Sequence, residues 1–220
     1  MAPVIEVAFF PLKAGTNFED SSDASQIVKE ASETLRQQDG YRGSYIGLRV
    51  EDQSVAEMLI DWDSIDAHTN FTQTPEFGPF AKSLVSLLAA QYRLQHVYID
   101  PTSATAARSA PATEMVTCYF PASVSEDEQK NYMEGVTKLG RLLEEKAEGC
   151  RGVCAGWVRE ELENEKIEGK KSKAMLMMLG WDSVEAHMKF RETQLFADNI
   201  HYLREGPAAM EVHHVKLAQL

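Results

Sequence analysis

The feature that most constrains the fold is an internal repeat. Residues 62–68 read Trp-Asp-Ser-Ile-Asp-Ala-His, and residues 181–187 read Trp-Asp-Ser-Val-Glu-Ala-His, so that five of the seven positions are identical. A motif that recurs after about half of the chain is typical of two copies of one small domain. The fold question therefore reduces to a unit of roughly 100 residues.

Other segments extend this repeat over most of the chain. The further matches are 40–43 with 149–152, 47–51 with 156–160, Phe10-Pro11 with Phe120-Pro121, and His96-Val97 with His214-Val215. The second copy has about ten extra residues, which lie within 161–173 and predict a longer, solvated hairpin loop. Residues 101–113 are small, polar and flanked by proline, as expected of a linker. We therefore predict a first repeat over 1–100, this linker, and a second repeat over 114–220.

Composition excludes several classes of protein. The 220 residues carry a formal charge of −12 without a clustered basic stripe, which disfavours nucleic acids and anionic membranes as partners. No apolar run approaches the roughly 18 residues of a membrane span, and the N-terminus does not resemble a signal peptide. Cys118, Cys150 and Cys154 do not suggest a secreted disulfide scaffold. We expect a cytoplasmic protein.

The hydrophobic pattern predicts the order β-α-β-β-α-β in each copy, with the last helical region broken in two. In the first copy the predicted strands are 3–10, 41–50, 55–62 and 94–99, and the predicted helices are 21–38, a short one through His68 and Phe71, and about 77–92. In the second copy the predicted elements are 115–120, 126–148, 152–161, 174–181, 183–203 and 209–217. Asp63 and Asp182 are predicted to cap the helices that follow them.

This order is that of the split βαβ, ferredoxin-like unit. Residues 174–181 are apolar at every position, and residues 4–10 nearly so, whereas a sheet with one face in water alternates apolar and polar side chains. Helices can cover only one face of such a sheet. The other face needs a partner sheet, which the other repeat can supply. We predict an α+β fold in which two ferredoxin-like repeats form an intramolecular dimeric α+β barrel.

These residues resemble the dimeric α+β barrel superfamily, and most closely its antibiotic biosynthesis monooxygenase (ABM) type in a tandem arrangement. The resemblance rests on the tryptophans Trp62 and Trp181, the Asp-Ser and Ala-His pairs that follow them, and the break at 74–77. It covers both halves of the chain as a fold-level pattern. It implies one of several activities: cofactor-free oxidation of phenolic polyketides, polyketide cyclisation or haem degradation. Other members of the family have no settled activity.

One departure from the family pattern bears on these activities. Several catalytic members carry His-Pro-x-His in the break before the second helix. Here the break reads Thr-Pro-Glu-Phe at 74–77 and Thr-Gln-Leu-Phe at 193–196. The haem-degrading and histidine-assisted cyclase interpretations therefore lose support.

Four residues are candidate catalytic groups. His68 and His187 lie at equivalent positions early in a helix, where a neutral imidazole can act as a general base or simply occupy the helix surface. His96 and Tyr98 are two residues apart on a strand, so we expect them on one face, where they could handle the proton of a phenol or enol. A solvent-exposed polar face is the alternative. The second copy has His214 and Lys216 at these positions, an asymmetry expected if one site works.

Five further residues are candidate substrate contacts. Trp62 and Trp181 end strands beside the expected helix–sheet cavity, where they could stack on an aromatic ring or anchor the core. His214 belongs to the second-copy pair. Arg49 could hold an anionic group, as could Arg159, although an exposed ion pair is the more ordinary role of such arginines.

The sequence contains no nucleotide-binding loop, serine-hydrolase order or zinc spacing, so we expect neither cofactor nor metal. We predict an enzyme of secondary-metabolism type that oxidises or cyclises an aromatic or polyketide-like molecule in an apolar pocket. The alternative is a non-catalytic ligand-binding or stress-response protein of the same fold. Because fusion supplies the contact between sheets, a monomer with an internal pseudo-dimer is expected, and a further homodimer is compatible with it.

Overall fold

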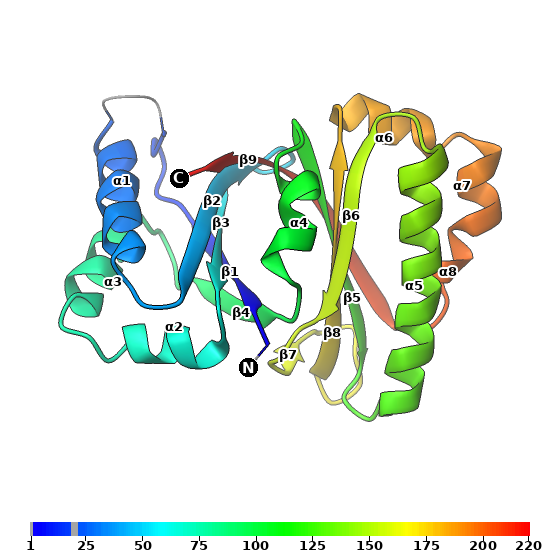
Figure 1. Ribbon diagram of the computed structural model, residues 1–220, viewed down its shortest axis with the longest axis horizontal. Coiled ribbons are helices and arrows are strands. Elements are labelled where there is room, and N and C mark those ends of the chain that lie inside the picture. Colours follow the sequence, from blue (N-terminus) through cyan, green and yellow to red (C-terminus); the bar gives the residue numbers. More distant parts are fainter. Residues whose placement is uncertain (1, 19–21) are drawn as a thin grey trace.

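A computed structural model describes residues 2–18 and 22–220 (Figure 1). The strands are β1 (Val4–Pro11), β2 (Tyr41–Arg49), β3 (Val55–Trp62), β4 (Arg93–Val97), β5 (Ala112–Pro121), β6 (Cys150–Trp157), β7 (Leu162–Glu163), β8 (Lys171–Trp181) and β9 (Ala209–Gln219). The helices are α1 (Asp23–Arg36), α2 (Ile65–Phe71), α3 (Phe77–Val85), α4 (Pro101–Arg108), α5 (Glu126–Lys146), α6 (Val184–Phe190), α7 (Gln194–Asn199) and α8 (His201–Arg204).

The predicted repeat is visible in the strand order. The first repeat contributes the run β4-β1-β3-β2 and the second the equivalent run β9-β5-β8-β6, and all of these neighbours are antiparallel. The two runs join where β2 pairs with β9. The ends of β6 and β4 also meet, because the Tyr98 N–H donates to the Trp157 carbonyl at 3.0 Å and the Arg159 N–H donates to the His96 carbonyl at 2.8 Å. The curled sheet is thus the predicted α+β barrel of two ferredoxin-like repeats.

Both junctions between the repeats depend on a glycine. A Cβ atom on Gly47 would lie 2.2 Å from the Lys216 carbonyl oxygen, and one on Gly156 would lie 2.2 Å from the Tyr98 carbonyl oxygen. No side chain can be accommodated that close to backbone, so glycine permits each strand to approach the other repeat. These two glycines belong to the segments 47–51 and 156–160 that the sequence repeats.

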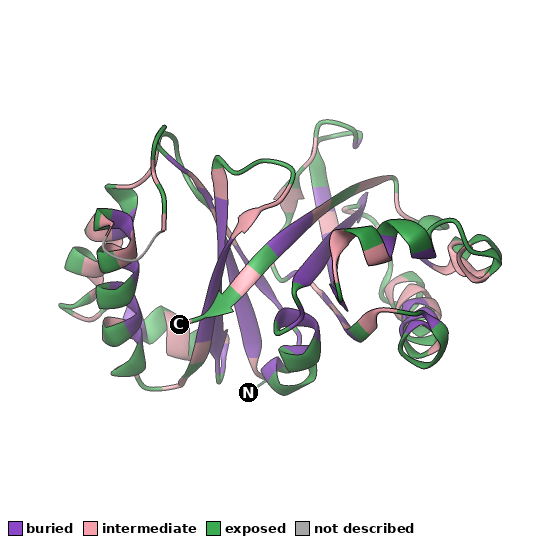
Figure 2. Ribbon diagram, turned by 90° about the horizontal axis from the view of Figure 1, so that it is seen from above, coloured by how far each residue is buried: buried purple, intermediate pink, exposed green. Residues whose placement is uncertain are grey.

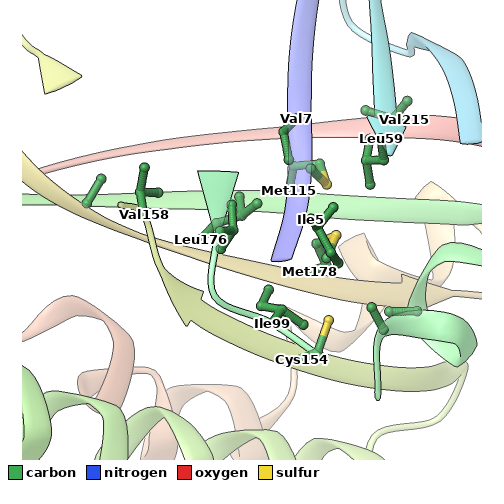
Figure 3. Packing of buried hydrophobic residues seen from close by; sticks show 14 of the residues in the cluster. Ile5, Val7, Leu59, Ile99, Met115, Cys154, Val158, Leu176, Met178 and Val215 are labelled. Carbon is green, nitrogen blue, oxygen red and sulfur yellow. The ribbon is translucent and has the colours of Figure 1, made fainter. Parts of the chain in front are cut away.

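Three apolar cores hold the fold together. The barrel interior is shared by the repeats: Figure 3 shows Ile5 and Leu59 of the first repeat close to Met115 and Met178 of the second. The other two cores lie between each sheet and its helices. Figure 2 shows the strands buried in the middle, with helices on both sides exposing their outer faces. This explains why β1 and β8 are apolar on both faces.

The segment 101–113 contains a helix that the sequence analysis did not predict. The Asp100 side chain caps α4, and Pro101 occupies its first turn. The helix lies against β6 and β8, with Ala104 and Ala107 fully buried in the barrel core. This amphipathic helix could not be recognised from the sequence, because the alanines and threonines that form it are also common in linkers.

Several predicted boundaries and caps need correction. Ser64, rather than Asp63, is the N-cap of α2, since its hydroxyl accepts from the Ala67 N–H; Ser183 does the same for α6. The Asp63 and Asp182 carboxylates instead pair with Arg42 of β2 and Arg151 of β6. Helix α3 ends at Val85 instead of Tyr92, and β6 ends at Trp157 instead of Glu161. The predicted long loop at 161–173 includes the short strand β7.

Two further points concern the ends of elements. The predicted start of the first helix at Ser21 lies outside the described residues; the described helix is capped by Ser22. The predicted match of Phe10-Pro11 with Phe120-Pro121 is two residues out of register, because Val4 and Ala112 hold equivalent places opposite Trp62 and Trp181.

Among the described helices, none combines the length and apolar character needed to cross a bilayer.

Candidate active site

Five side chains from both repeats form a polar chain beside the first helix–sheet core. Glu6 projects from β1, Trp62 ends β3, His68 lies in α2, His96 lies in β4, and Glu160 follows β6 of the second repeat. Glu6 and His96 are only 5% and 6% exposed. The repeated Trp-Asp-Ser motif produces part of this arrangement, since it ends the strand and starts the helix that carries the histidine.

The members of this chain are linked by successive short contacts. The Trp62 Nε1–H donates to Glu6 Oε2 at 2.7 Å, and His68 Nε2 lies 3.5 Å from the same oxygen. His68 Nδ1 and His96 Nε2 are hydrogen-bonded at 2.8 Å, and His96 Nδ1 and Glu160 Oε1 at 2.7 Å. The Trp62 ring stacks on the His68 ring at a centroid distance of 5.5 Å. A continuous path therefore connects the buried Glu6 with Glu160.

Burial shifts the ionisation of the inner members. It raises the pKa of Glu6 to about 7, against an opposing effect of the hydrogen bond from Trp62. Burial, together with the nearby His96, lowers the pKa of His68 to about 4. At neutral pH His68 is therefore a neutral imidazole, and Glu6 exchanges its proton near the working pH of most enzymes.

The second repeat contains the same chain. The Trp181 Nε1–H donates to Glu114 Oε2 at 2.9 Å, and His187 Nε2 lies 3.5 Å from that oxygen. His187 Nδ1 contacts His214 Nε2 at 2.8 Å, and His214 Nδ1 contacts Glu51 Oε1 at 2.5 Å. Burial raises the pKa of Glu114 to about 7 and lowers that of His187 to about 4. Here the outer glutamate comes from the first repeat.

A cavity of about 200 Å³ opens beside the first chain. Its polar lining includes Glu6, Trp62 and His68. The rest of its lining is mostly apolar and rich in aromatic rings, and comprises Ala8, Phe10, Met58, Ile60, Phe71, Thr72, Phe77, Phe80, Ala81, Leu84, Val85, Leu88, Tyr92 and Leu94. This is the cavity that the sequence analysis expected between the helices and the sheet. A few polar groups in an apolar hollow are typical of small-molecule sites.

The two repeats differ in the residues around their polar chains. The register of β1 on β3 and of β5 on β8 places Val116 where the first repeat has Ala8. Arg191 follows α6 where Thr72 follows α2. Both replacements put a larger side chain in the second repeat, and Arg191 adds a positive charge near His187. The first repeat is therefore the better candidate for binding a neutral apolar ligand.

The predicted pair of His96 and Tyr98 is not formed. Strand β4 ends at Val97, and the chain then turns, because the Ile99 N–H donates to the Val97 carbonyl at 2.9 Å. Tyr98 is 46% exposed, whereas His96 is buried and contacts His68. The prediction assumed that the strand continues, which would have put both side chains on one face. The exposed Lys216 holds the corresponding place in β9.

The predicted role of Arg49 also needs correction. Its Nε donates to Glu57 Oε1 at 2.6 Å, and its guanidinium lies 5.5 Å from the centre of the Phe9 ring. Glu57 is fully buried, so this arginine neutralises a carboxylate of the protein and does not line the cavity beside Glu6. Arg159 has an exposed side chain, 3.7 Å from Glu160.

Sequence reasoning missed the four glutamates that complete the two chains. A signal existed for Glu6, because it is the single charged residue in the apolar segment 4–10. Glu51 and Glu160 were visible as the last residues of the repeated segments 47–51 and 156–160. Their role could not be predicted, because each contacts a histidine of the other repeat, far away in the sequence.

The same groups bear on metal binding. One donor atom each from Glu6, His68 and His96 lie within 4.8 Å of one another, as do those of Glu114, His187 and His214. Two histidines and a carboxylate can ligate divalent transition metals. In the structure, however, the histidine nitrogens that would face an ion bond to each other, and a metal would have to break that hydrogen bond. The donor atoms are therefore already satisfied as a hydrogen-bonded chain.

The shifted pKa values of the buried glutamates and histidines predict an unusual dependence of stability on pH. Glu6 and Glu114 bind protons more tightly in the folded state than their ordinary pKa of 4.5, so their contribution declines as pH rises towards about 7. His68 and His187 bind protons less tightly than their ordinary pKa of 6.5, so their contribution grows as pH rises from about 4. Each shift corresponds to about 3 kcal/mol. We expect these opposing effects to cancel between about pH 4.5 and 6.5.

Urea unfolding at a series of pH values tests this balance. The free energy of unfolding should change little from pH 5 to 6.5 and then fall by about 1 kcal/mol by pH 7.5. In Glu6→Gln one carboxyl no longer titrates, so stability should instead rise with pH between 5 and 6.5. A wild-type curve that rises steeply over this window would contradict the raised pKa of the two glutamates.

The fold and the paired polar chains together define a dimeric α+β barrel protein whose two protomers are fused. Residues 4–83 match the family described as "Antibiotic biosynthesis monooxygenase". The first repeat thus matches the ABM family, and the whole chain is a tandem, ABM-like barrel, as its sequence resemblance indicated. A search of curated proteins found no match.

Solved structures share this architecture over the whole chain. One, from Fusobacterium nucleatum subsp. nucleatum ATCC 25586, is described as "Putative monooxygenase"; it is 14% identical, with a TM-score of 0.63 over 98% of this chain and 92% of its own. Another from Lactobacillus acidophilus NCFM, described in the same words, is 8% identical, with a TM-score of 0.61 over 100% and 96%. An "anthrone oxidase-like protein" is 13% identical, with a TM-score of 0.61 over 99% and 92%. At these identities the likeness concerns the fold.

Proposed function

We propose that the protein is a cofactor-independent monooxygenase that oxidises a compact aromatic or polyketide-like molecule in the cavity of the first repeat. The observation that carries this proposal is the Glu6 carboxyl, whose pKa is about 7, in a cavity lined by aromatic rings and beside the neutral His68. A general base works best when its pKa lies near the working pH. The cavity is smaller than the 300–1,000 Å³ usual for drug-sized ligands, which favours a compact substrate.

The reaction would begin with removal of a proton from an activated C–H group, such as the CH₂ beside a phenolic ring system. Glu6 accepts this proton, and the resulting carbanion reacts with O₂ through a new C–O bond. The peroxide anion takes a proton back from Glu6 and becomes a hydroperoxide. Loss of the second C–H proton then forms a C=O bond and breaks the O–O bond, so that one O₂ yields one ketone and one water.

The protein's contribution to this chemistry is placement and desolvation. Stacking on Trp62 and the phenylalanine rings would hold an aromatic substrate against the carboxyl group. An apolar surrounding removes the water that would otherwise protonate the carbanion. The descriptions of the structural neighbours, "putative monooxygenase" for two of them and "anthrone oxidase-like protein" for the third, support an oxidation of this class.

A two-stage experiment tests the proposal. A thermal-shift screen of anthrone and smaller phenols should reveal ligands that raise the melting temperature, because ligands that bind only the folded state stabilise it. Each ligand is then tested for oxygen uptake in an oxygen electrode, where we expect one O₂ consumed per ketone formed. Saturable binding without oxygen uptake would instead support the non-catalytic ligand-binding alternative, and a product of unchanged oxidation state would indicate cyclisation.

A further inference from the structure

We infer that Glu160 of the second repeat is a positioning residue for the site in the first repeat, where it fixes which nitrogen of His96 and of His68 carries the proton. The catalytic consequence rests on the proposed function, whereas the proton arrangement can be measured without any substrate. Glu51 stands in the same relation to His214 and His187, so each repeat completes the histidine pair of the other.

Glu160 contacts His96 through both of its carboxylate oxygens. Its Oε1 lies 2.7 Å from His96 Nδ1, and its Oε2 accepts the His96 backbone N–H at 2.8 Å. Burial alone would raise the pKa of Glu160, but the hydrogen bonds from His96 outweigh it and lower the pKa. Glu160 is therefore an ionised carboxylate at neutral pH, and a carboxylate can only accept hydrogen bonds. The proton between the two residues must belong to His96 Nδ1.

The position of the His96 proton determines which nitrogen of His68 carries a proton. A neutral His96 with its proton on Nδ1 has a lone pair on Nε2, so His68 Nδ1 must donate across the 2.8 Å contact. His68 Nε2 is then left with a lone pair, and this atom faces Glu6 Oε2 at 3.5 Å. The Glu160 carboxylate thus orients an acceptor nitrogen towards the cavity, although Glu160 itself lies at the opposite end of the polar chain from Glu6.

The same polarity allows a proton to be held away from the substrate and then returned to it. A proton that Glu6 takes from a substrate can pass to His68 Nε2 while His68 Nδ1–H passes its proton to His96 Nε2. His96 then carries a positive charge next to the Glu160 carboxylate, which stabilises it as the aspartate does in a Ser-His-Asp triad. The reverse transfers restore the proton to Glu6, which gives it to the peroxide anion. The Glu160 side chain is 28% exposed, so this end of the polar chain is in contact with solvent.

This arrangement explains why the repeat preserves the spacing between a glycine and a glutamate. Gly47 and Gly156 permit the close approach of each junction strand, and Glu51 and Glu160 follow them by four residues at the same junctions. The junctions therefore both close the barrel and deliver a carboxylate to the opposite histidine pair. Each site is complete only when the two repeats are together.

Histidine ¹⁵N NMR of the full chain tests the proton arrangement directly. We expect His96 of the wild type to be protonated at Nδ1. Glu160→Gln should keep this form, because the amide oxygen still accepts, whereas Glu160→Ala should shift His96 towards the Nε2–H form. Glu163→Ala, an exposed glutamate in β7, is the matched control and should change neither histidine. An Nε2–H form of His96 in the wild type, or an unchanged spectrum in a folded Glu160→Ala, would overturn the inference.

Kinetics with an oxidisable ligand from the screen provide the second readout. Glu160→Gln should lower kcat about 10- to 100-fold with little change in KM, since the substrate does not touch Glu160 but the positive His96 loses its counter-ion. Equal kcat values for Glu160→Gln and wild type would overturn the role of Glu160 in this reversible proton transfer. If no ligand is oxidised but the NMR result holds, the proposed function fails while the tautomer-setting role stands.

Discussion

Replacement of Glu6 by glutamine should lower kcat for oxygen uptake by at least about 100-fold. Glutamine keeps the size of the side chain and can still accept from the Trp62 Nε1–H, but it cannot take a proton. Loss of a general base typically costs a factor of 10² to 10⁴. The measurement is steady-state oxygen consumption with a substrate found by the thermal-shift screen, together with the melting temperature, which shows that the variant is folded.

The pH dependence sharpens this prediction. Because the pKa of Glu6 is about 7, kcat of the wild type should rise with pH through about 7 as the carboxyl ionises, and the residual activity of Glu6→Gln should lack this rise. Glu114→Gln makes the same change in the second repeat, so comparison of the two variants assigns turnover to one repeat or divides it between them. Full activity in Glu6→Gln would remove Glu6 from the mechanism.

The fold could be predicted from the sequence because the relevant signals are local and occur twice. Apolar strand-like segments and helical spacing indicate most of the elements, and the apolar residues on both faces of β1 and β8 require a second sheet on the other side. Residues 101–108 escaped prediction for the opposite reason: their alanines and threonines form a weak pattern, and only burial against β6 and β8 shows that they are a packed helix.

The site could be predicted only in part. The structure brings three of the candidate residues together, since His68 contacts His96 and stacks on Trp62, and of these Trp62 and His68 line the cavity. The expected pairing of Tyr98 with His96 is not formed, because the strand ends at Val97 and the end of a strand cannot be predicted to one residue from its sequence. Glu160 was missed because its partner is 64 residues away and in the other repeat. Contacts that depend on how two repeats meet produce no periodic pattern in the sequence of either repeat.

A second large effect concerns the helix between the repeats. Arg108→Met should lower the free energy of unfolding by about 3–5 kcal/mol, because it leaves the buried Asp61 without its counter-charge. Arg108 is 1% exposed; its Nη1 and Nη2 donate to the two Asp61 oxygens at 2.5 and 3.0 Å, and Nη2 also donates to the Pro101 carbonyl at 2.9 Å. Its guanidinium stacks on Tyr45 at 4.3 Å. Urea unfolding near neutral pH measures the loss.

Arg151→Met supplies the matched control, since Arg151 also pairs with an aspartate, Asp182, but both side chains are substantially exposed. Exposed pairs contribute at most about 1 kcal/mol, so this variant should unfold almost as the wild type does. Burial raises the pKa of Asp61 even with Arg108 beside it, so the cost of Arg108→Met should shrink when Asp61→Asn removes the charge as well. If Arg108→Met costs no more than Arg151→Met, the link between α4 and β3 contributes little to stability, and packing of Ala104 and Ala107 alone holds the helix on the barrel.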